Sequence, residues 1–243
     1  MSVNRSAEIS PRVYARVGGV LYLIIIIAGA TGEVFVRGSS VVSGNAASTA
    51  HNIMASPSLW RAGIAGDLVM HVCDVPLMVI FYVLLRPVNG NLALLALLFN
   101  LTQTAVLVAN KLNLLLPIFL LGDAEYLKAF TAEQLQALSY VSLRTHDSGF
   151  AVGLVFFGAA CLVVGYLIIR SGYLPRTLGV LMQIAGVCYI TNSFALIVWP
   201  SLAAQLFPFI LLPPFVAELS MALWLLVKGV DLAKWKSRVE GVI

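Results

Sequence analysis

Long apolar stretches separated by short polar segments are the main pattern along this chain. Six stretches are expected to be helical, at about residues 17–36, 59–85, 92–121, 146–169, 178–199 and 207–227. At ~1.5 Å per residue, about twenty apolar residues cross a hydrocarbon core of ~30 Å. The pattern predicts an all-α, polytopic membrane helix bundle with six transmembrane helices, forming a single domain over residues 1–243.

Composition and charge support this class of protein. The chain is 60% hydrophobic and 11% charged, with a mean hydropathy of +0.95, which exceeds what a soluble core needs. Cytoplasmic loops of membrane proteins are rich in Lys and Arg. If the N-terminus is inside, ten of the fifteen basic residues are cytoplasmic. Both termini are therefore predicted to be cytoplasmic, and the basic pI of 9.1 needs no nucleic-acid partner.

The connections between the predicted spans also contain structural signals. Thr131 and Gln134 have the spacing of a capping box, which predicts an amphipathic helix on the outer surface near residues 131–142. The stretch at residues 47–54 is a candidate for a short interfacial helix. The third span is long enough to require tilt or a kink near Pro117.

Ionisable and amide side chains lie inside segments that are otherwise suited to lipid. Each one costs a few kcal/mol or more if it faces hydrocarbon alone, so it needs partners or a polar cavity. In the second span, Asp67, His71 and Asp74 follow at steps of four and three, which places them on one helix face. The residues expected to line a polar pocket are Glu33, Asp67, His71, Asp74, Asn110, Lys111, His146, Asp147, Asn192 and Glu218.

Depth along the helices indicates where this pocket opens. Counted from the outer ends of their spans, Asp67, His71 and Glu218 fall about 12 to 18 Å deep, at ~1.5 Å per residue. The inner half of the bundle contains few polar residues. The sequence therefore predicts an intramembrane pocket that faces the outer side, is closed on the cytoplasmic side by apolar packing, and binds a small molecule, part of a lipid or an ion.

Several functions remain open for such a pocket. It could serve transport or sensing. Alternatively, Asp67, His71 and Glu218 could bind a divalent metal that activates water, as in a membrane-embedded hydrolase acting on a lipid-like substrate. Haem ligation by His71 and His146 is disfavoured by their different depths. In a purely structural alternative, Glu33, Arg37, Arg61, Asp67 and Lys111 form ion pairs that fix helix register and bind no ligand.

Several phrases of the sequence also resemble a known family. They include Gly32-Glu33 followed by Arg37-Gly38-Ser39, the run from Arg61 to Asp67, Arg86-Pro87-Val88-Asn89, and the segment from Glu218 to Gly229. Together they are similar to the bacterial membrane-protein family catalogued as domain of unknown function 4386. The resemblance implies a multi-pass protein of the bacterial cytoplasmic (inner) membrane. It supplies no activity, ligand or catalytic residue.

The expected partners are the lipid bilayer and a small-molecule or lipid ligand. Cys73, Cys161 and Cys188 all fall within predicted spans, so neither a disulfide framework nor a Cys-x-x-Cys metal site is expected. No Gly-x-x-x-Gly pair lies on a clearly lipid-facing stripe, and the sequence leaves an oligomer open.

Overall fold

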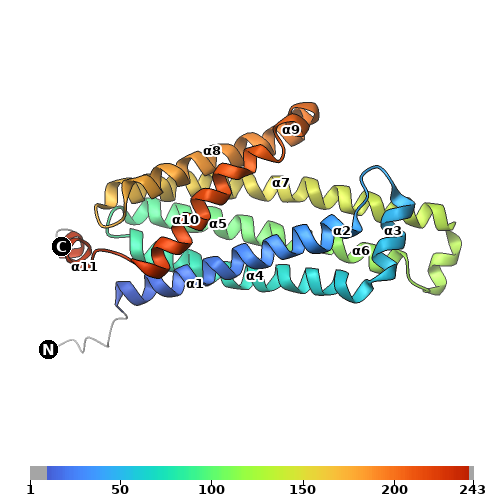
Figure 1. Cartoon of the computed structure of the whole chain (residues 1–243), viewed down its shortest axis with the longest axis horizontal. Helices are drawn as coiled ribbons and strands as arrows, with labels where there is room; N and C mark the ends of the chain where they lie inside the picture. Colours follow the sequence, from blue (N-terminus) through green and yellow to red (C-terminus); the bar gives the residue numbers. More distant parts are fainter. Residues whose placement is uncertain (1–9, 241–243) are drawn as a thin grey trace.

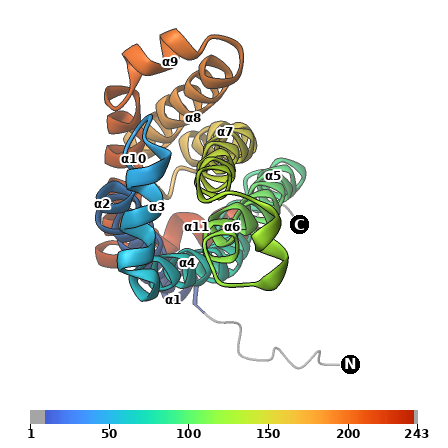
Figure 2. The same cartoon turned by 90° about the vertical axis from the view of Figure 1, so that its right-hand side faces the viewer.

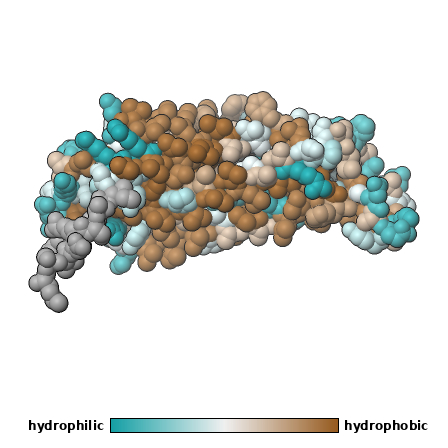
Figure 3. Space-filling model, turned by 90° about the horizontal axis from the view of Figure 1, so that it is seen from below, coloured by the Kyte–Doolittle hydropathy of each residue, from teal (hydrophilic) through white to brown (hydrophobic). Residues whose placement is uncertain are grey.

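A computed structural model describes residues 10–240, which form helices and no β-strand. Within this range, six helices are long and apolar enough to cross a membrane: Pro11–Ser40, Pro57–Leu85, Gly90–Leu120, Ala132–Ser171, Arg176–Val198 and Phe209–Val227. The hydrophobic surface forms a band with hydrophilic residues at both ends (Figure 3). These features confirm the expected all-helical class and the six spans.

Some spans are single helices and others join two or three helical segments. The first joins α1 (Pro11–Ala30), η1 (Thr31–Arg37) and α2 (Gly38–Ser40), and the second is α4 (Pro57–Leu85). The third joins α5 (Gly90–Asn110) and α6 (Leu112–Leu120). The last three are α7 (Ala132–Ser171), α8 (Arg176–Val198), and η3 (Phe209–Leu211) with α10 (Leu212–Val227).

Shorter helices cover the ends of the bundle. We call the end that holds α3 (Ala46–Ala55) and η2 (Glu125–Ala129) the outer end. Helix α9 (Pro200–Leu206) precedes the last span. The start of α1 and helix α11 (Leu232–Glu240) lie at the opposite, inner end (Figure 1). Seen from the outer end, α3 lies across the bundle (Figure 2). The short helix expected within residues 47–54 is confirmed as part of α3.

One local expectation about a helix needs correction. The surface helix expected near residues 131–142 begins at the predicted capping box of Thr131 and Gln134, but it continues into the fourth span as one 40-residue helix. No Gly or Pro stands between residues 132 and 148 to end it. In the third span, Pro117 lies inside α6, and the helix is also interrupted at Lys111.

Close packing of α7 against α8 depends on glycines. A Cβ atom on Gly165 would lie 2.5 Å from the Gly179 carbonyl oxygen, and one on Gly158 would lie 2.8 Å from the Gly186 carbonyl oxygen. Backbones this close have no room for a side chain. Small residues at helix contacts are typical of membrane bundles, where van der Waals packing replaces the hydrophobic effect between helices.

The buried interior has two apolar clusters with a polar layer between them. The inner cluster includes Leu77, Ile80 and Leu84 of α4, and the outer cluster includes Trp60 and Ile64 of the same helix. Between them α4 places Asp67, His71 and Asp74, all buried. The third span repeats the order, with buried Gln103, Thr104, Asn110 and Lys111 between Ala96 and Leu114. The polar side chains therefore gather at one level of the bundle.

Candidate functional site

Asp67 is the centre of a charged group formed by three spans. Its Oδ2 atom accepts hydrogen bonds from Arg37 Nη1 at 2.7 Å and from Lys111 Nζ at 2.8 Å. The Asp67 side chain is 1% exposed, Lys111 is 5% exposed and Arg37 is 15% exposed. Two cations compensate one buried carboxylate, which makes ionisation tolerable away from water. We call Glu33, Arg37, Asp67 and Lys111 the Asp67 cluster.

Glu33 completes the cluster from the side of the bundle. Its Oε2 atom accepts a hydrogen bond from Arg37 Nε at 2.7 Å, but the Glu33 side chain is 70% exposed. The two residues lie in η1, a π-helical segment in which the Gly38 amide donates to the Glu33 carbonyl oxygen. π-helical turns inside α-helices occur frequently at functional sites. Here the wider turn lets Arg37 reach both Glu33 and Asp67.

Backbone irregularity also positions Lys111. The residue stands between α5 and α6, where the Lys111 amide donates to the Val108 carbonyl oxygen and the Leu114 amide donates to the Lys111 carbonyl oxygen. Both are three-residue steps, tighter than those of an α-helix. The interrupted third span therefore supplies the second cation of the cluster. Irregular backbone at membrane depth is tolerated where protein surrounds it or where it lines a cavity.

Gly32 permits the close approach of the first two spans. A Cβ atom at this position would lie 2.7 Å from Asp67 Oδ1 and 3.2 Å from Arg37 Nη2. Asp67 Oδ1 is itself buried and has no hydrogen-bond partner among residues 10–240. The carboxylate therefore retains one free acceptor atom beside the smallest residue of the site.

His71 lies one helical turn inward from Asp67, and Asp74 lies one turn further. His71 is 3% exposed, and its Nε2 atom has no hydrogen-bond partner within the described chain. Asp74 accepts a hydrogen bond from the Thr104 hydroxyl of α5. The three residues that were expected to share one face of the second span are therefore all buried, but their hydrogen-bond partners differ.

Glu218 is held separately, on α10. It accepts a hydrogen bond from the Tyr189 hydroxyl of α8 and is half-buried. No ion pair within 4.0 Å involves Glu218 or Asp74 in the described residues. Neither carboxyl group therefore has the cationic partners that stabilise Asp67.

Within residues 10–240, the remaining predicted site residues have no hydrogen bond or ion pair with the Asp67 cluster. Asn110 donates from Nδ2 to the His146 carbonyl oxygen at 2.8 Å, and the buried His146 ring stacks on Phe150. Asp147 is exposed and pairs with Arg144 at 3.3 Å. Asn192 is half-buried on α8. The structure thus brings Glu33, Asp67 and Lys111 together and distributes the other candidates over separate polar contacts.

The geometry does not assemble the metal ligands that the sequence suggested. Across residues 10–240, no group of three or more His, Cys, Asp and Glu side chains is arranged to hold a metal ion. The proposed set of Asp67, His71 and Glu218 is divided, because Asp67 is bonded to two cations and Glu218 to a tyrosine hydroxyl. Such a donor set does not fit a divalent cation in this arrangement.

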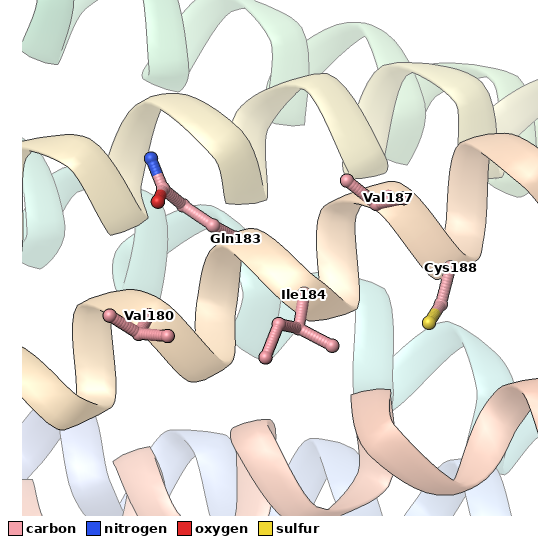
Figure 4. A pocket seen from close by; sticks show the side chains of 5 residues that line it. All are labelled: Val180, Gln183, Ile184, Val187 and Cys188. Carbon is pink, nitrogen blue, oxygen red and sulfur yellow. The ribbon is translucent and has the colours of Figure 1, made fainter.

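Two cavities lie away from these residues. One of about 270 Å³ is lined by Val180, Gln183, Ile184, Val187 and Cys188 along one stretch of α8 (Figure 4). The other, of about 610 Å³, lies at the inner end between the connections and α11, and includes Lys234 and Arg238. Neither is lined by a residue that was expected in the polar pocket.

Several contributors were missed from the sequence. The sequence indicates Arg37 and Arg61 only as partners in structural ion pairs, and Arg61 is exposed in the structure. It indicates no role for Gly32, Thr104 or Tyr189. A hydroxyl or a glycine in the middle of an apolar span is an ordinary residue of membrane helices, so only the three-dimensional contact distinguishes these positions.

Comparisons with known proteins place the chain in a family. It belongs to the family described as domain of unknown function 4386 (DUF4386), which matches residues 17–229. It is similar to an uncharacterized protein of the archaeon Archaeoglobus fulgidus, with 28% identity over 171 residues, covering 70% of this chain and 86% of the relative. No solved structure matches the chain.

The family membership confirms the resemblance seen in the sequence. The family description names no ligand or reaction, and the six candidate spans come from the structure itself. The relative is archaeal, so this comparison gives no support to the expectation of a specifically bacterial membrane. Any function has to be argued from the Asp67 cluster itself.

Proposed function

We propose that this protein is a membrane-embedded binding protein, used in transport or sensing, whose Asp67 cluster takes up a small ligand or ion from the outer side of the membrane. Both termini are cytoplasmic in this proposal, as the distribution of Lys and Arg predicts. The main observation in support is that two irregular spans each supply a cation to the buried Asp67 carboxylate. The π-helical turn supplies Arg37, and the interruption between α5 and α6 supplies Lys111.

A purely structural role would not require this backbone. Buried ion pairs contribute little net stability, because desolvation of the charges offsets their attraction. Regular helices would hold an ion pair without the π-helical turn or the interruption at Lys111. Discontinuous helices near the middle of the membrane form substrate and ion sites in many transporters. The free Asp67 Oδ1 and His71 Nε2 atoms provide further positions that a ligand or water can satisfy.

The Asp67 cluster is not reached through the open pocket at the outer end that the sequence predicts. The outer apolar cluster, with Trp60, Leu114 and Leu143, lies between the polar layer and the outer end. Access along the bundle axis is therefore closed in this conformation. The exposed side of the cluster is at Glu33 on η1. We propose that ligands enter from this side, near the outer interface.

Binding and transport assays together test this function. Purified protein in lipid nanodiscs would be screened by thermal unfolding against small anions, cations and neutral solutes, and positives would be tested for uptake into proteoliposomes. At least one compound should raise the melting temperature of wild-type protein and lose this effect in Asp67→Asn. A screen without any stabilising compound, or stabilisation that persists unchanged in Asp67→Asn, would contradict the proposal.

A further inference from the structure

The two carboxylates that bind Arg37 differ in their surroundings. Asp67 is 1% exposed and also bonded to Lys111, whereas Glu33 is 70% exposed and bonded to Arg37 alone. Both Arg37 contacts are 2.7 Å long, to Nε for Glu33 and to Nη1 for Asp67. Among the described residues Glu33 forms no other ion pair, so its release breaks one contact, whereas release of Asp67 from Arg37 would leave a buried carboxylate with a single cation. The Glu33 contact is therefore the one that can be exchanged at low cost.

The charge of the cluster depends on this exposed residue. Its buried part contains two cations, Arg37 and Lys111, and one anion, Asp67. Glu33 supplies the remaining negative charge from the accessible side. If Glu33 turns away from Arg37, the buried part carries an uncompensated positive charge. A site in this state favours an anion and disfavours a cation.

We propose that the Asp67 cluster binds the carboxylate or phosphate group of an anionic ligand, and that this group replaces Glu33 on Arg37. This inference rests on the proposed binding function and names the class of ligand. Glu33 then acts as a tethered substitute that keeps the site neutral while no ligand is bound. Asp67 and Lys111 remain paired and fix the position of the guanidinium.

The geometry around Arg37 suits such an exchange. A guanidinium presents parallel N–H donors that match two oxygens of a carboxylate or phosphate. Asp67 fixes the Nη1 side, which leaves the edge with Nε and Nη2 for Glu33 or its competitor. Gly32 keeps this edge free of a neighbouring side chain, because a Cβ atom at this position would lie only 3.2 Å from Nη2. The contact of Nε with the exposed Glu33 side chain places this edge on the accessible side of η1.

The test uses the full chain in nanodiscs of zwitterionic lipid. Dissociation constants for acetate, succinate and inorganic phosphate would be compared with those for acetamide and ethylamine, in wild-type protein and in Glu33→Gln. Removal of the competing carboxylate should tighten binding of the anions on the order of tenfold. The neutral amide and the amine should show no such gain. Arg37→Lys should lose most of the anion affinity, because an ammonium lacks the fork geometry.

A matched control separates this effect from general surface charge. Glu125→Gln removes another exposed carboxylate near the outer end, one that pairs with Lys128 at 2.6 Å and lies outside the cluster. This variant should bind the anions as wild type does. A second set of nanodiscs with phosphatidylglycerol distinguishes the source of the anion. If the headgroup is the natural ligand, this lipid should compete with the soluble anions more strongly in Glu33→Gln.

The outcomes distinguish this inference from the function it rests on. Unchanged or weaker anion binding in Glu33→Gln, or an equal gain in Glu125→Gln, would overturn the anion-exchange proposal. Binding of only neutral or cationic compounds at Asp67 would overturn it while leaving the proposed function intact. Absence of any binding to wild type and to all variants would overturn both.

Discussion

Asp67 and Lys111 form a buried ion pair of 2.8 Å between the second and third spans. Lys111 stands between α5 and α6, so this contact joins a continuous helix to an interrupted one. The pair shares its carboxylate oxygen with Arg37 of the first span. Three spans are therefore connected through one oxygen atom.

Removal of one partner of this pair should destabilise the protein more than removal of both. Asp67→Asn or Lys111→Met alone leaves a buried charge uncompensated, for an expected loss of about 3–5 kcal/mol. The double variant should recover part of that loss, since Arg37 and Glu33 still neutralise each other. Thermal and denaturant unfolding in detergent would measure this cycle, with the exposed Glu125–Lys128 pair as a control of about 0–1 kcal/mol. Strictly additive losses would contradict the coupling.

The α7–α8 contact should be intolerant of any side chain at Gly165. The Cβ atom of Gly165→Ala would lie 2.5 Å from the Gly179 carbonyl oxygen, so the two backbones must separate. We expect a loss of about 1–3 kcal/mol, as for overpacked cores. Gly66→Ala is the matched control, because a Cβ atom there meets nothing within 4 Å. That control should be neutral or stabilising by up to about 1 kcal/mol, since alanine favours a helix. Similar melting temperatures for the two variants would refute this role.

The Trp60 indole of α4 should stabilise the contact of this helix with α6. The Trp60 Nε1–H donates to the Leu114 carbonyl oxygen at 2.8 Å inside the outer apolar cluster. Trp60→Phe retains an aromatic ring but leaves that contact unmade, and we expect a loss of about 1–3 kcal/mol. Hydrogen exchange in residues 112–120 should become faster. Trp199→Phe, at an exposed position, should leave both measurements unchanged.

Helix α11 at the inner end should depend on pH through Asp231. Its carboxylate accepts hydrogen bonds from the Lys234 and Ala233 amides, and these bonds hold the pKa of Asp231 below its ordinary value of 3.8. A lowered folded-state pKa stabilises the helix above pH 3.8 and loses this effect as pH falls through the folded value. Protection factors of α11 amides should therefore fall in acid. Asp231→Asn keeps an acceptor that does not titrate, and equal pH dependence in both proteins would contradict this assignment.

The topology is testable by labelling of single cysteines. In a protein whose three cysteines are replaced, Ser43→Cys near the outer end should react with a membrane-impermeant maleimide in intact cells. Ser237→Cys on α11 should react only after the membrane is opened. The reverse pattern would place the Asp67 cluster nearer the cytoplasm and contradict entry of ligand from outside.

The spans could be predicted from the sequence, because helix length and hydropathy are dictated locally by the bilayer. The capping box at Thr131 was also readable, since a cap needs only two residues at fixed spacing. The continuation of α7 into the fourth span was less apparent. A polar stretch with no breaker can extend a membrane helix into water, so polarity alone did not mark the helix boundary.

The candidate site was predicted in its residues more than in its arrangement. The spacing of Asp67, His71 and Asp74 correctly indicated one buried face of α4. It could not indicate that Arg37 and Lys111 reach Asp67, because that contact depends on the π-helical turn and on the break at Lys111. Glu218 lay at a similar counted depth, yet it faces Tyr189 of α8. Depth gives a level in the bundle but no direction around the helix.

An experimental density map of wild-type protein in nanodiscs, recorded with and without the anion that binds best, is the most direct test of anion exchange at Arg37. We expect density for that anion within hydrogen-bond distance of Arg37, with Glu33 displaced from the guanidinium and the Asp67–Lys111 contact retained. A map at saturating ligand in which Glu33 stays on Arg37 and nothing reaches the Asp67 cluster would refute anion exchange.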